Sequence, residues 1–489
     1  MTTFRHSEAK RPPLSLRMKA WQWAIIGVEA LLLFGVLGGA AWLLLINGPA
    51  AQQAAQIATP IPAGPTSTPS RTPTPFAWPT SLPSPTPAPV NTRVVSREAL
   101  NQATIGKIEQ QVIALRALKP RREVPVEFLT RSEMLDYAKR QYAADTKVIQ
   151  ELALYRALGL IQPGAQVDPE TRINMIASNI AGFYDPENKR LHVISELENL
   201  GADEKMTLAH EYTHALQDQQ FDLTRYQGRI QTTDAYLAMM SVPEGDATVV
   251  MSLYLYGNTT AGDWDYLAYR AAFADRSVIT ATGVSTRTGQ IAYFPYIQGA
   301  QFVTALWLDG KGWTEVNHAY ADPPKSTSQV LHPSRYLTSH ATPVPLPLPD
   351  LGPVLGKDWS PTIKLDTLGE FITSVHLDEF LRDPQSAQRA AEGWAGDSFA
   401  LWQASGDRQA FAWQIAWDTP RDAGEFLDAY SDLFRRRTGE SRTVERQDTD
   451  LHWYSGNAGS GLIRRANDRT LVLWGPNKAT VEKLLAAFK

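Results

Sequence analysis

The sequence predicts an α+β protein that follows a transmembrane helix and a disordered stalk. Three observations lead to this prediction. The central part repeats apolar residues with helical spacing and contains only a few strand-like runs. The last third has the order strand, strand, helix, strand, strand, helix. Residues 1–93 hold one long apolar segment and then a segment rich in Pro, Thr and Ser. We therefore expect a mainly helical domain with a small β-sheet, followed by a small C-terminal α+β domain.

The N-terminal segments predict a single-pass membrane protein. Residues 1–20 carry five Lys or Arg and one acid, and residues 21–46 are apolar except for one Gln and one Glu. The apolar segment is long enough to cross a bilayer, and the basic flank favours a cytoplasmic N-terminus. We expect residues 1–20 to be a cytoplasmic tail, residues 21–46 to be a signal anchor in the lipid bilayer, and the chain after the anchor to be extracytoplasmic. Cleavage after Ala50 or Ala51 is the alternative.

The remaining boundaries follow from composition. Residues 47–93 carry almost no charge and few large apolar residues apart from Pro, so they cannot bury a core and should form an extended stalk. Residues 94–342 form the predicted helical domain, and residues 343–353 are a Pro-rich connector. Residues 354–489 form the C-terminal α+β domain.

Composition excludes several classes of site. The chain has 489 residues and a net charge of −4, which gives no basic footprint of the kind expected for a nucleic-acid-binding protein. It has no cysteine, which excludes thiol catalysis, cysteine-ligated zinc, iron–sulfur clusters and disulfides.

The central chemical motif is His210-Glu211-Tyr212-Thr213-His214. Residues 202–221 contain no Pro and no Gly, and their apolar and polar residues fall on opposite sides of a helix. Residues four apart lie on one helical face, so His210 and His214 can bind one metal ion with Glu211 beside it as a general base. The alternative is a pair of solvated histidines on a helix surface.

A site with two histidines needs a third protein ligand, and Glu244 is the best candidate. It follows Pro243, which suits the first turn of a new helix, and an apolar helical run comes after it. Asp246 is placed to orient a ligating histidine through its second ring nitrogen. The alternative for both acids is compensation of a helix dipole. Asp218, one turn after His214, is a rival ligand or a supporting residue.

These motifs resemble the gluzincin group of zinc metallopeptidases, with His210, His214 and Glu244 as ligands and Glu211 as the base. More closely, the chain resembles bacterial membrane-anchored metallopeptidases of the HEYTHALQDQ…EGDA type. Supporting stretches are residues 181–194, 326–336 and 394–397. The resemblance implies a zincin-like fold, one Zn²⁺ per chain, and hydrolysis of a peptide or protein substrate by a zinc-activated water.

Two further expectations depend on the resemblance. Zinc peptidases usually need a Tyr or His that stabilises the oxyanion, and Tyr296, His332 and Tyr336 are the candidates. Residues 180–184 and 190–194 predict a hairpin, and the resemblance implies that one of its strands borders the substrate cleft. The alternative is an ordinary structural hairpin.

A competing hypothesis belongs to another functional class. The chain can be a non-catalytic, membrane-anchored module that binds a cell-envelope partner, with a structural or vestigial metal site. A closed structural site would need a fourth protein ligand, and Asp218 is the nearby candidate.

Overall fold

The computed structural model describes residues 97–142, 146–179, 181–194, 200–258, 284–439, 446–448 and 451–488. The predicted cytoplasmic tail, signal anchor and stalk lie outside these residues. Among the helices of the described ranges, none combines the length and the apolar character that a membrane span requires.

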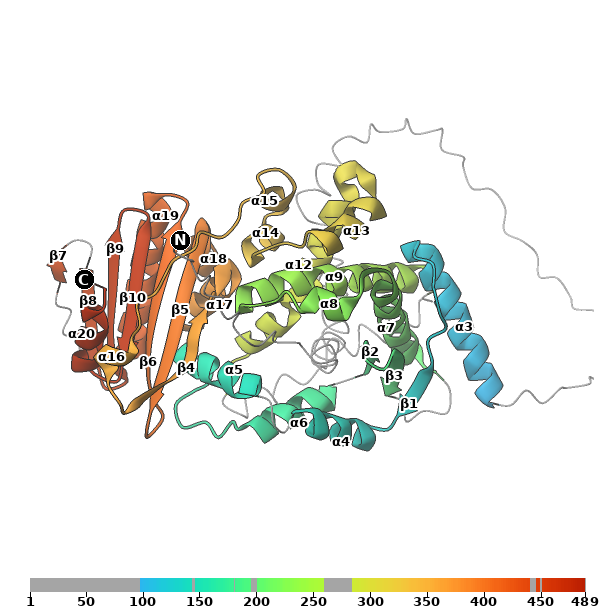
Figure 1. Ribbon diagram of the computed structural model, residues 1–489, viewed down its shortest axis with the longest axis horizontal. Coiled ribbons are helices and arrows are strands. Elements are labelled where there is room, and N and C mark those ends of the chain that lie inside the picture. Colours follow the sequence, from blue (N-terminus) through green and yellow to red (C-terminus); the bar gives the residue numbers. More distant parts are fainter. Residues whose placement is uncertain are drawn as a thin grey trace, which may run out of the picture.

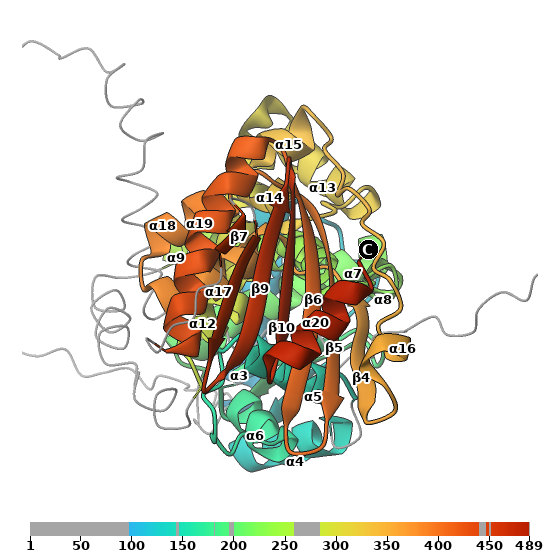
Figure 2. The ribbon, with the colours of Figure 1, turned by 90° about the vertical axis from the view of Figure 1, so that its left-hand side faces the viewer.

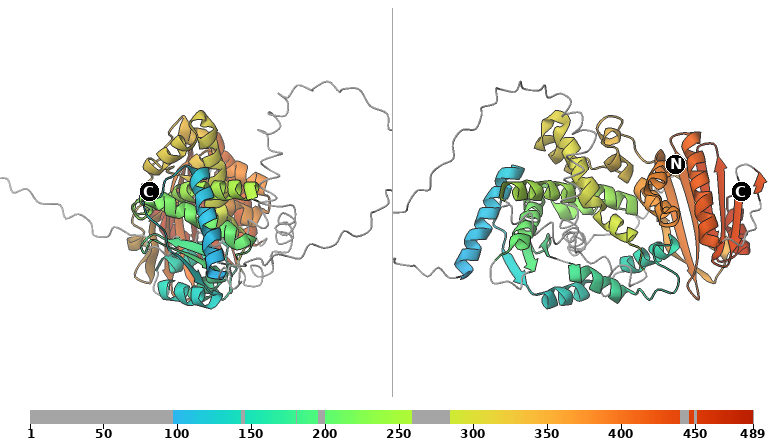
Figure 3. Two further views of the ribbon diagram at one scale, coloured as in Figure 1. Left: turned by 90° about the vertical axis from the view of Figure 1, so that its right-hand side faces the viewer. Right: turned by 180° about the vertical axis from the view of Figure 1, so that it is seen from behind.

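The described chain forms an α+β structure with a helical half and a sheet half (Figure 1). The helices of the first half are α3 (Arg97–Arg116), α4 (Arg131–Tyr142), α5 (Thr146–Ala157), α6 (Pro169–Asn179), α7 (Ala202–Phe221), α8 (Leu223–Gln227), α9 (Thr233–Asn258), α12 (Arg287–Leu306), η1 (Trp307–Lys311), α13 (Trp313–Ala321), α14 (Thr327–Leu331) and α15 (Pro333–Leu337). Seen from behind, α3 and the large sheet lie at opposite ends of the molecule (Figure 3).

The small sheet of the helical half contains the predicted hairpin. Its strands are β1 (Val126–Leu129), β2 (Gly182–Asp185) and β3 (Arg190–Ile194), in the order β1-β3-β2. β2 and β3 pair antiparallel, which confirms the hairpin, and β1 pairs parallel to β3. The edge strand β2 packs closely on α7, because a Cβ on Gly182 would lie 2.6 Å from Cγ2 of Thr207.

Helix α7 has the bounds that the sequence predicts. The carboxylate of Glu204 accepts a hydrogen bond from the Gly201 N–H at 2.9 Å, which satisfies a donor at the helix start. Its apolar side packs against α3 and α9, with Leu208 and Leu216 almost fully buried. The opposite side, which carries the two histidines, therefore faces the interior of the helical half.

Helix α9 differs from the prediction, because no new helix starts at Pro243. A single helix runs from Thr233 to Asn258 through this proline. Proline lacks an N–H, so the carbonyl of Met239 loses its normal helical donor. The hydroxyl of Tyr226 donates to that carbonyl at 2.6 Å, which replaces the missing bond.

Helix α12 also continues through a proline, Pro295. It packs on α9 with almost no space between the two backbones. A Cβ on Gly245 would lie 2.2 Å from the carbonyl carbon and oxygen of Gly299, so both positions need glycine. This contact is one residue after Glu244 and positions α12 beside the histidines.

The sheet half forms one antiparallel sheet with helices on both faces (Figure 2). Its strand order is β4-β5-β6-β10-β9-β8-β7. The elements are α16 (Gly352–Leu355), β4 (Trp359–Asp366), α17 (Gly369–Leu381), α18 (Pro384–Ala391), β5 (Trp394–Ala404), β6 (Arg408–Trp417), α19 (Pro420–Thr438), β7 (Arg446–Asp448), β8 (Leu451–Gly456), β9 (Gly459–Ala466), β10 (Arg469–Gly475) and α20 (Lys478–Ala486).

The apolar core continues from one half to the other. Helices α17 and α19 lie on the sheet face toward the helical half, and α20 covers the other face. The predicted connector lies along the start of β5, where the Val344 N–H donates to the carbonyl of Ala395 at 2.8 Å. The two halves are therefore packed together along a shared interface.

Candidate metal centre

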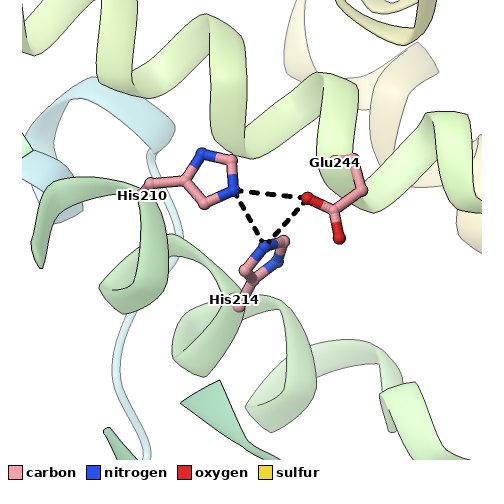
Figure 4. A group of neighbouring side chains, drawn as sticks. All are labelled: His210, His214 and Glu244. Carbon is pink, nitrogen blue, oxygen red and sulfur yellow. Dashed lines mark hydrogen bonds and ion pairs between the residues drawn. The ribbon is translucent and has the colours of Figure 1, made fainter. Parts of the chain in front are cut away.

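Three side chains from α7 and α9 converge at one buried point (Figure 4). Nε2 of His210 lies 3.1 Å from Nε2 of His214, and these two nitrogens lie 3.2 and 3.3 Å from Oε2 of Glu244. The three side chains are 2%, 4% and 0% exposed. The one-turn spacing on α7 and the passage of α9 beside it thus bring together the three predicted ligands, which we call the metal triad.

The metal triad fits a metal ion. Tetrahedral coordination by imidazole nitrogen and carboxylate oxygen at about 2.0–2.1 Å places neighbouring ligand atoms about 3.3 Å apart. The three measured separations lie close to this value. Nδ1 of His210 and Oε1 of Glu244 are also buried with no hydrogen-bond partner among the described residues. Buried polar atoms are normally satisfied, so the free oxygen of the Glu244 carboxylate marks a site that a ligand can complete, whereas Nδ1 of His210 points away from the other two ligands (Figure 4).

Gln217 fixes the ring of His214, and the sequence analysis missed this role. The Gln217 amide N–H donates to the carbonyl of Pro243 at 3.0 Å, so its amide oxygen faces Nδ1 of His214 at 2.9 Å. A carbonyl oxygen only accepts, so Nδ1 carries the proton and Nε2 keeps its lone pair for a metal. The available signal was Gln217 itself, a polar residue three positions after His214 on the same helix.

Glu211 lies next to the metal triad and is held by the small sheet. Its Oε2 accepts a hydrogen bond from the backbone N–H of Tyr184 in β2 at 2.9 Å. Its Oε1 is buried without a hydrogen-bond partner among the described residues. Burial raises the pKa of Glu211, and Glu244 raises it further, although the two histidines act in the opposite direction.

Without a metal, His214 and Glu244 stabilise each other's charged forms. Burial alone would lower the pKa of His214, but the carboxylates of Glu244 and Glu211 raise it to about 9. Burial would likewise raise the pKa of Glu244, but the imidazoles lower it to about 2. A metal ion replaces the shared proton in this arrangement, so metal binding releases protons.

Tyr296 is the one oxyanion candidate that the structure brings to the metal triad. It lies on α12, fully buried, and its ring stacks on His210 with 5.9 Å between centroids and 26° between planes. The other two candidates have different partners. Nε2 of His332 lies 2.7 Å from a carboxylate oxygen of Glu370 in α17, and the Tyr336 hydroxyl donates to the carbonyl of Asp322.

The predicted role of Asp246 is not met. Its two carboxylate oxygens accept from Nε of Arg116 at 2.6 Å and from the Tyr320 hydroxyl at 2.7 Å. Two residues along a helix correspond to a rotation of about 200°, so Asp246 points away from the side that carries Glu244. Asp246 therefore joins α9 to α3 and α13.

Asp218 is neither a metal ligand nor a partner of a ligating histidine in this structure. Its carboxylate accepts from the Tyr184 hydroxyl at 2.9 Å, from Nζ of Lys189 at 2.8 Å and from Arg122 at 3.2 Å. The Leu223 N–H donates to it as well. These donors occupy both oxygens, so Asp218 ties the β2–β3 hairpin to the end of α7.

Comparison with known proteins gives one match within the chain. Residues 361–485 match a family described as "Domain of unknown function (DUF8575)". No curated protein and no solved structure matches the chain. The matched residues make up most of the sheet half and do not include the metal triad or Glu211.

Proposed function

We propose that the protein is a zinc metallopeptidase in which His210, His214 and Glu244 hold one Zn²⁺. The observation that supports this proposal is the convergence of the three ligand atoms at 3.1–3.3 Å beside the buried carboxylate of Glu211. Two imidazoles and one carboxylate are the protein ligands of one common class of catalytic zinc site. The resemblance to gluzincins gives the same ligand set.

In this proposal Glu211 is the general base. When bound, zinc supplies Lewis acidity, which makes water more acidic and polarises a peptide carbonyl. The Tyr184 N–H holds Oε2 of Glu211, so the unpartnered Oε1 takes the proton from the attacking water and later returns it to the leaving amine. Burial raises the pKa of Glu211, which strengthens its carboxylate as a base.

Gln217 and Tyr296 support the chemistry in different ways. Gln217 holds His214 in the tautomer that leaves Nε2 free for the metal. Tyr296 packs on the ring of His210, and we propose its hydroxyl as the oxyanion donor, because His332 and Tyr336 are bonded elsewhere.

The cellular setting is proposed from the sequence. Residues 21–46 would anchor the protein in a membrane, with the metal centre on the extracytoplasmic side and a peptide or protein as substrate. Alkaline carbonate extraction of membranes and protease accessibility of intact cells test this arrangement. Extraction into the soluble fraction would contradict the anchor.

The burial of the site favours a second candidate function, a non-catalytic module with a structural metal. His210, Glu211, His214 and Glu244 are almost completely buried, so a substrate must open the site before it can react. A non-catalytic module with a structural metal would need no such opening. The two candidates differ in whether the metal keeps a coordination position that a small ligand can take.

The test uses the full-length protein with three variants. We expect about one zinc per chain in the parent and in Glu211→Gln, and much less in Glu244→Ala. Glu211→Gln should reduce hydrolysis of labelled casein by at least about 10³-fold, because it removes the base and leaves the ligands. Asp203→Asn, on the same helix, is the control with the same charge change and should behave like the parent.

Two results would contradict the proposed peptidase function. Glu211→Gln with parental turnover would remove its assigned base. One tightly bound zinc that accepts no hydroxamate, in a parent without hydrolytic activity, would favour the structural metal instead.

A further inference from the structure

A large cleft lies where α5 and the loop of residues 159–168 face the sheet half. Its volume is about 1440 Å³, and its other walls are the ends of α17 and α19 and the β5–β6 turn. The Gln409 amide donates to the carbonyl of Ala153 at 2.9 Å across the base of the cleft. A Cβ on Gly159 would lie 2.5 Å from the ring of Phe380, which also shows how closely the two walls join there. None of the metal triad residues lines this cleft.

The cleft is basic although the chain as a whole is acidic. Its six arginines face four acids, which gives a formal charge of +2 in a chain of net charge −4. The arginines are Arg156, Arg382, Arg408, Arg435, Arg436 and Arg437, and the acids are Asp168, Glu379, Asp407 and Asp432.

Three of the four acids are bonded to other donors. Asp168 accepts from the Thr171 N–H at 2.7 Å, at the start of α6. Glu379 accepts from the Ser285 hydroxyl and lies 3.6 Å from Arg287. Asp432 pairs with Arg435, one of the six arginines, one turn later on α19. Asp168 and Glu379 are thus occupied by donors outside the six arginines, whereas the pair of Asp432 and Arg435 leaves the net charge of the cleft unchanged.

Among the six arginines of the cleft, Arg437 is the one with a buried nitrogen that has no hydrogen-bond partner among the described residues. Its guanidinium lies 4.0 Å from the ring centroid of Trp474 and 5.8 Å from that of Phe380. Its Nη1 is buried without a hydrogen-bond partner, and Arg437 forms no ion pair among the described residues. Burial lowers the pKa of Arg437 to about 10, although the nearby Tyr430 acts in the opposite direction.

The polar groups behind Arg437 are neutral. Nδ1 of His376 donates to the carbonyl of Leu158 at 2.8 Å, and its Nε2 accepts from the Tyr430 hydroxyl at 2.9 Å. Burial and the charge of Arg437 lower the pKa of His376 to about 3, so this imidazole stays uncharged. Arg437 is half-buried, with Nη1 fully buried, and stacking on Trp474 contributes at most about 2 kcal/mol, which offsets only part of the cost of burying that nitrogen without a partner.

We propose that the cleft binds a ligand through an oxyanion, a carboxylate or a phosphate, which the guanidinium of Arg437 receives. A guanidinium offers a planar fork of donors that matches both groups, and the unpartnered Nη1 belongs to this fork. The other arginines of the cleft supply the surrounding positive charge. The two sources of the oxyanion are a free phosphate and the acidic side chains of a peptide. The volume exceeds the range of about 300–1,000 Å³ for small-molecule pockets, so the cleft has room for an extended ligand.

The test is calorimetric titration of the full-length protein at low ionic strength. The probes are inorganic phosphate, tri-glutamate with an acetylated N-terminus and an amidated C-terminus and, as the neutral control, tri-glutamine capped in the same way. We expect phosphate or tri-glutamate to bind the parent and tri-glutamine not to bind. Arg437→Met should weaken binding at least tenfold. Arg421→Met is the matched control, because Arg421 lies on the same helix, its side chain is 85% exposed, and the charge change is the same.

A second variant covers the case in which Arg437→Met fails to fold. Arg437→Lys keeps the charge over Trp474 and removes the fork, so it should retain the parental circular dichroism spectrum and still bind more weakly than Arg421→Met. Binding of phosphate alone identifies a free phosphate as the source, and binding of tri-glutamate identifies an acidic peptide. The proposal is overturned if neither probe binds the parent, or if both Arg437 variants bind as tightly as Arg421→Met.

Discussion

The metal triad and the junction between the two halves both bury carboxylates of helix α9, but they surround them differently. At the junction, Oδ1 of Asp234 accepts from both the N–H and the hydroxyl of Thr327. Nearby, Asp397 accepts from the N–H groups of Leu368 and Gly369 and from the indole of Trp394. One oxygen of Asp234 and one of Glu244 are buried without a partner among the described residues, but the bonded oxygen of Glu244 faces two imidazoles in place of hydroxyl and N–H donors.

This difference separates structural from functional burial of an acid. Backbone and indole N–H groups give Asp397 a complete set of donors, so it can hold the two halves together without a ligand. The lone pairs of the metal triad point at one another, which is stable only with a shared proton or a cation. We therefore expect the metal triad to respond to metal and the junction to be independent of it.

The largest expected effect is the loss of metal from the metal triad. Metal at about 1,000 times its dissociation constant stabilises the folded state by about 4 kcal/mol. Chelation should therefore lower the free energy of unfolding of the parent by about this amount, measured by urea titration. Glu244→Ala should show no response to chelation. An equal response in Glu244→Ala would show that the metal is bound elsewhere.

The junction should depend on Asp397 with or without metal. Asp397→Ala leaves the donors of Leu368, Gly369 and Trp394 buried without an acceptor, which we expect to cost about 3 kcal/mol. Asp397→Asn keeps one acceptor and should cost less. Urea titrations with and without a chelator measure the cost of each substitution and the contribution of the metal to the free energy of unfolding. If chelation has no effect in Asp397→Ala, the junction and the metal triad are coupled, which would contradict their expected independence.

Much of the metal triad could be predicted from the sequence because it depends on local periodicity. The i, i+4 spacing of His210 and His214 and the bounds of α7 follow from rules that act within one helix. Glu244 could be proposed because few acids are placed to supply a third ligand. The exact environment of Glu244 could not be predicted, since the path of α9 through Pro243 depends on the distant hydroxyl of Tyr226.

The roles of other residues needed the tertiary structure. Asp246 is two residues after Glu244, and only the continuous helix shows that it faces Arg116. The stretches around Ser326 and Asp397, which support the family resemblance, belong to the junction. Strand β4, which contains Pro361, and strand β9, which begins with Gly459, lack a strong strand signal and are additional to the four strands that the sequence predicts in this half.

A smaller effect is expected from pH, and it distinguishes the junction from the metal triad. Burial raises the pKa of Asp234 to about 8, from about 3.8 in the unfolded chain, and the charges of Asp397 and Glu370 act in the same direction. The folded state thus binds more protons than the unfolded state between these values, so stability decreases as pH rises through this window.

Asp234→Asn should remove this dependence. For the metal-saturated parent, the free energy of unfolding should fall by about 2 kcal/mol more between pH 6 and pH 8 than for the variant. The metal-saturated form is used because His214 then cannot take up a proton. Urea titrations at several pH values give the two slopes. Parallel slopes would mean that Asp234 is already ionised at pH 6.

The smallest expected effect concerns Gln217, whose bond to His214 links the metal triad to the backbone of α9. Gln217→Ala removes the acceptor that fixes the ring and leaves the Pro243 carbonyl without that donor. Loss of such a support typically weakens metal binding by about 10–100-fold. We expect Gln217→Ala to weaken zinc binding about tenfold, or by about 1.4 kcal/mol, in a competition titration with a zinc chelator. Gln220→Ala, at an exposed position on the same helix, is the control.

Because Gln217 acts only through His214, Gln217→Ala should have no further effect on zinc affinity in a His214→Ala background. An undiminished further loss there would mean that Gln217 acts through the packing of α7 on α9.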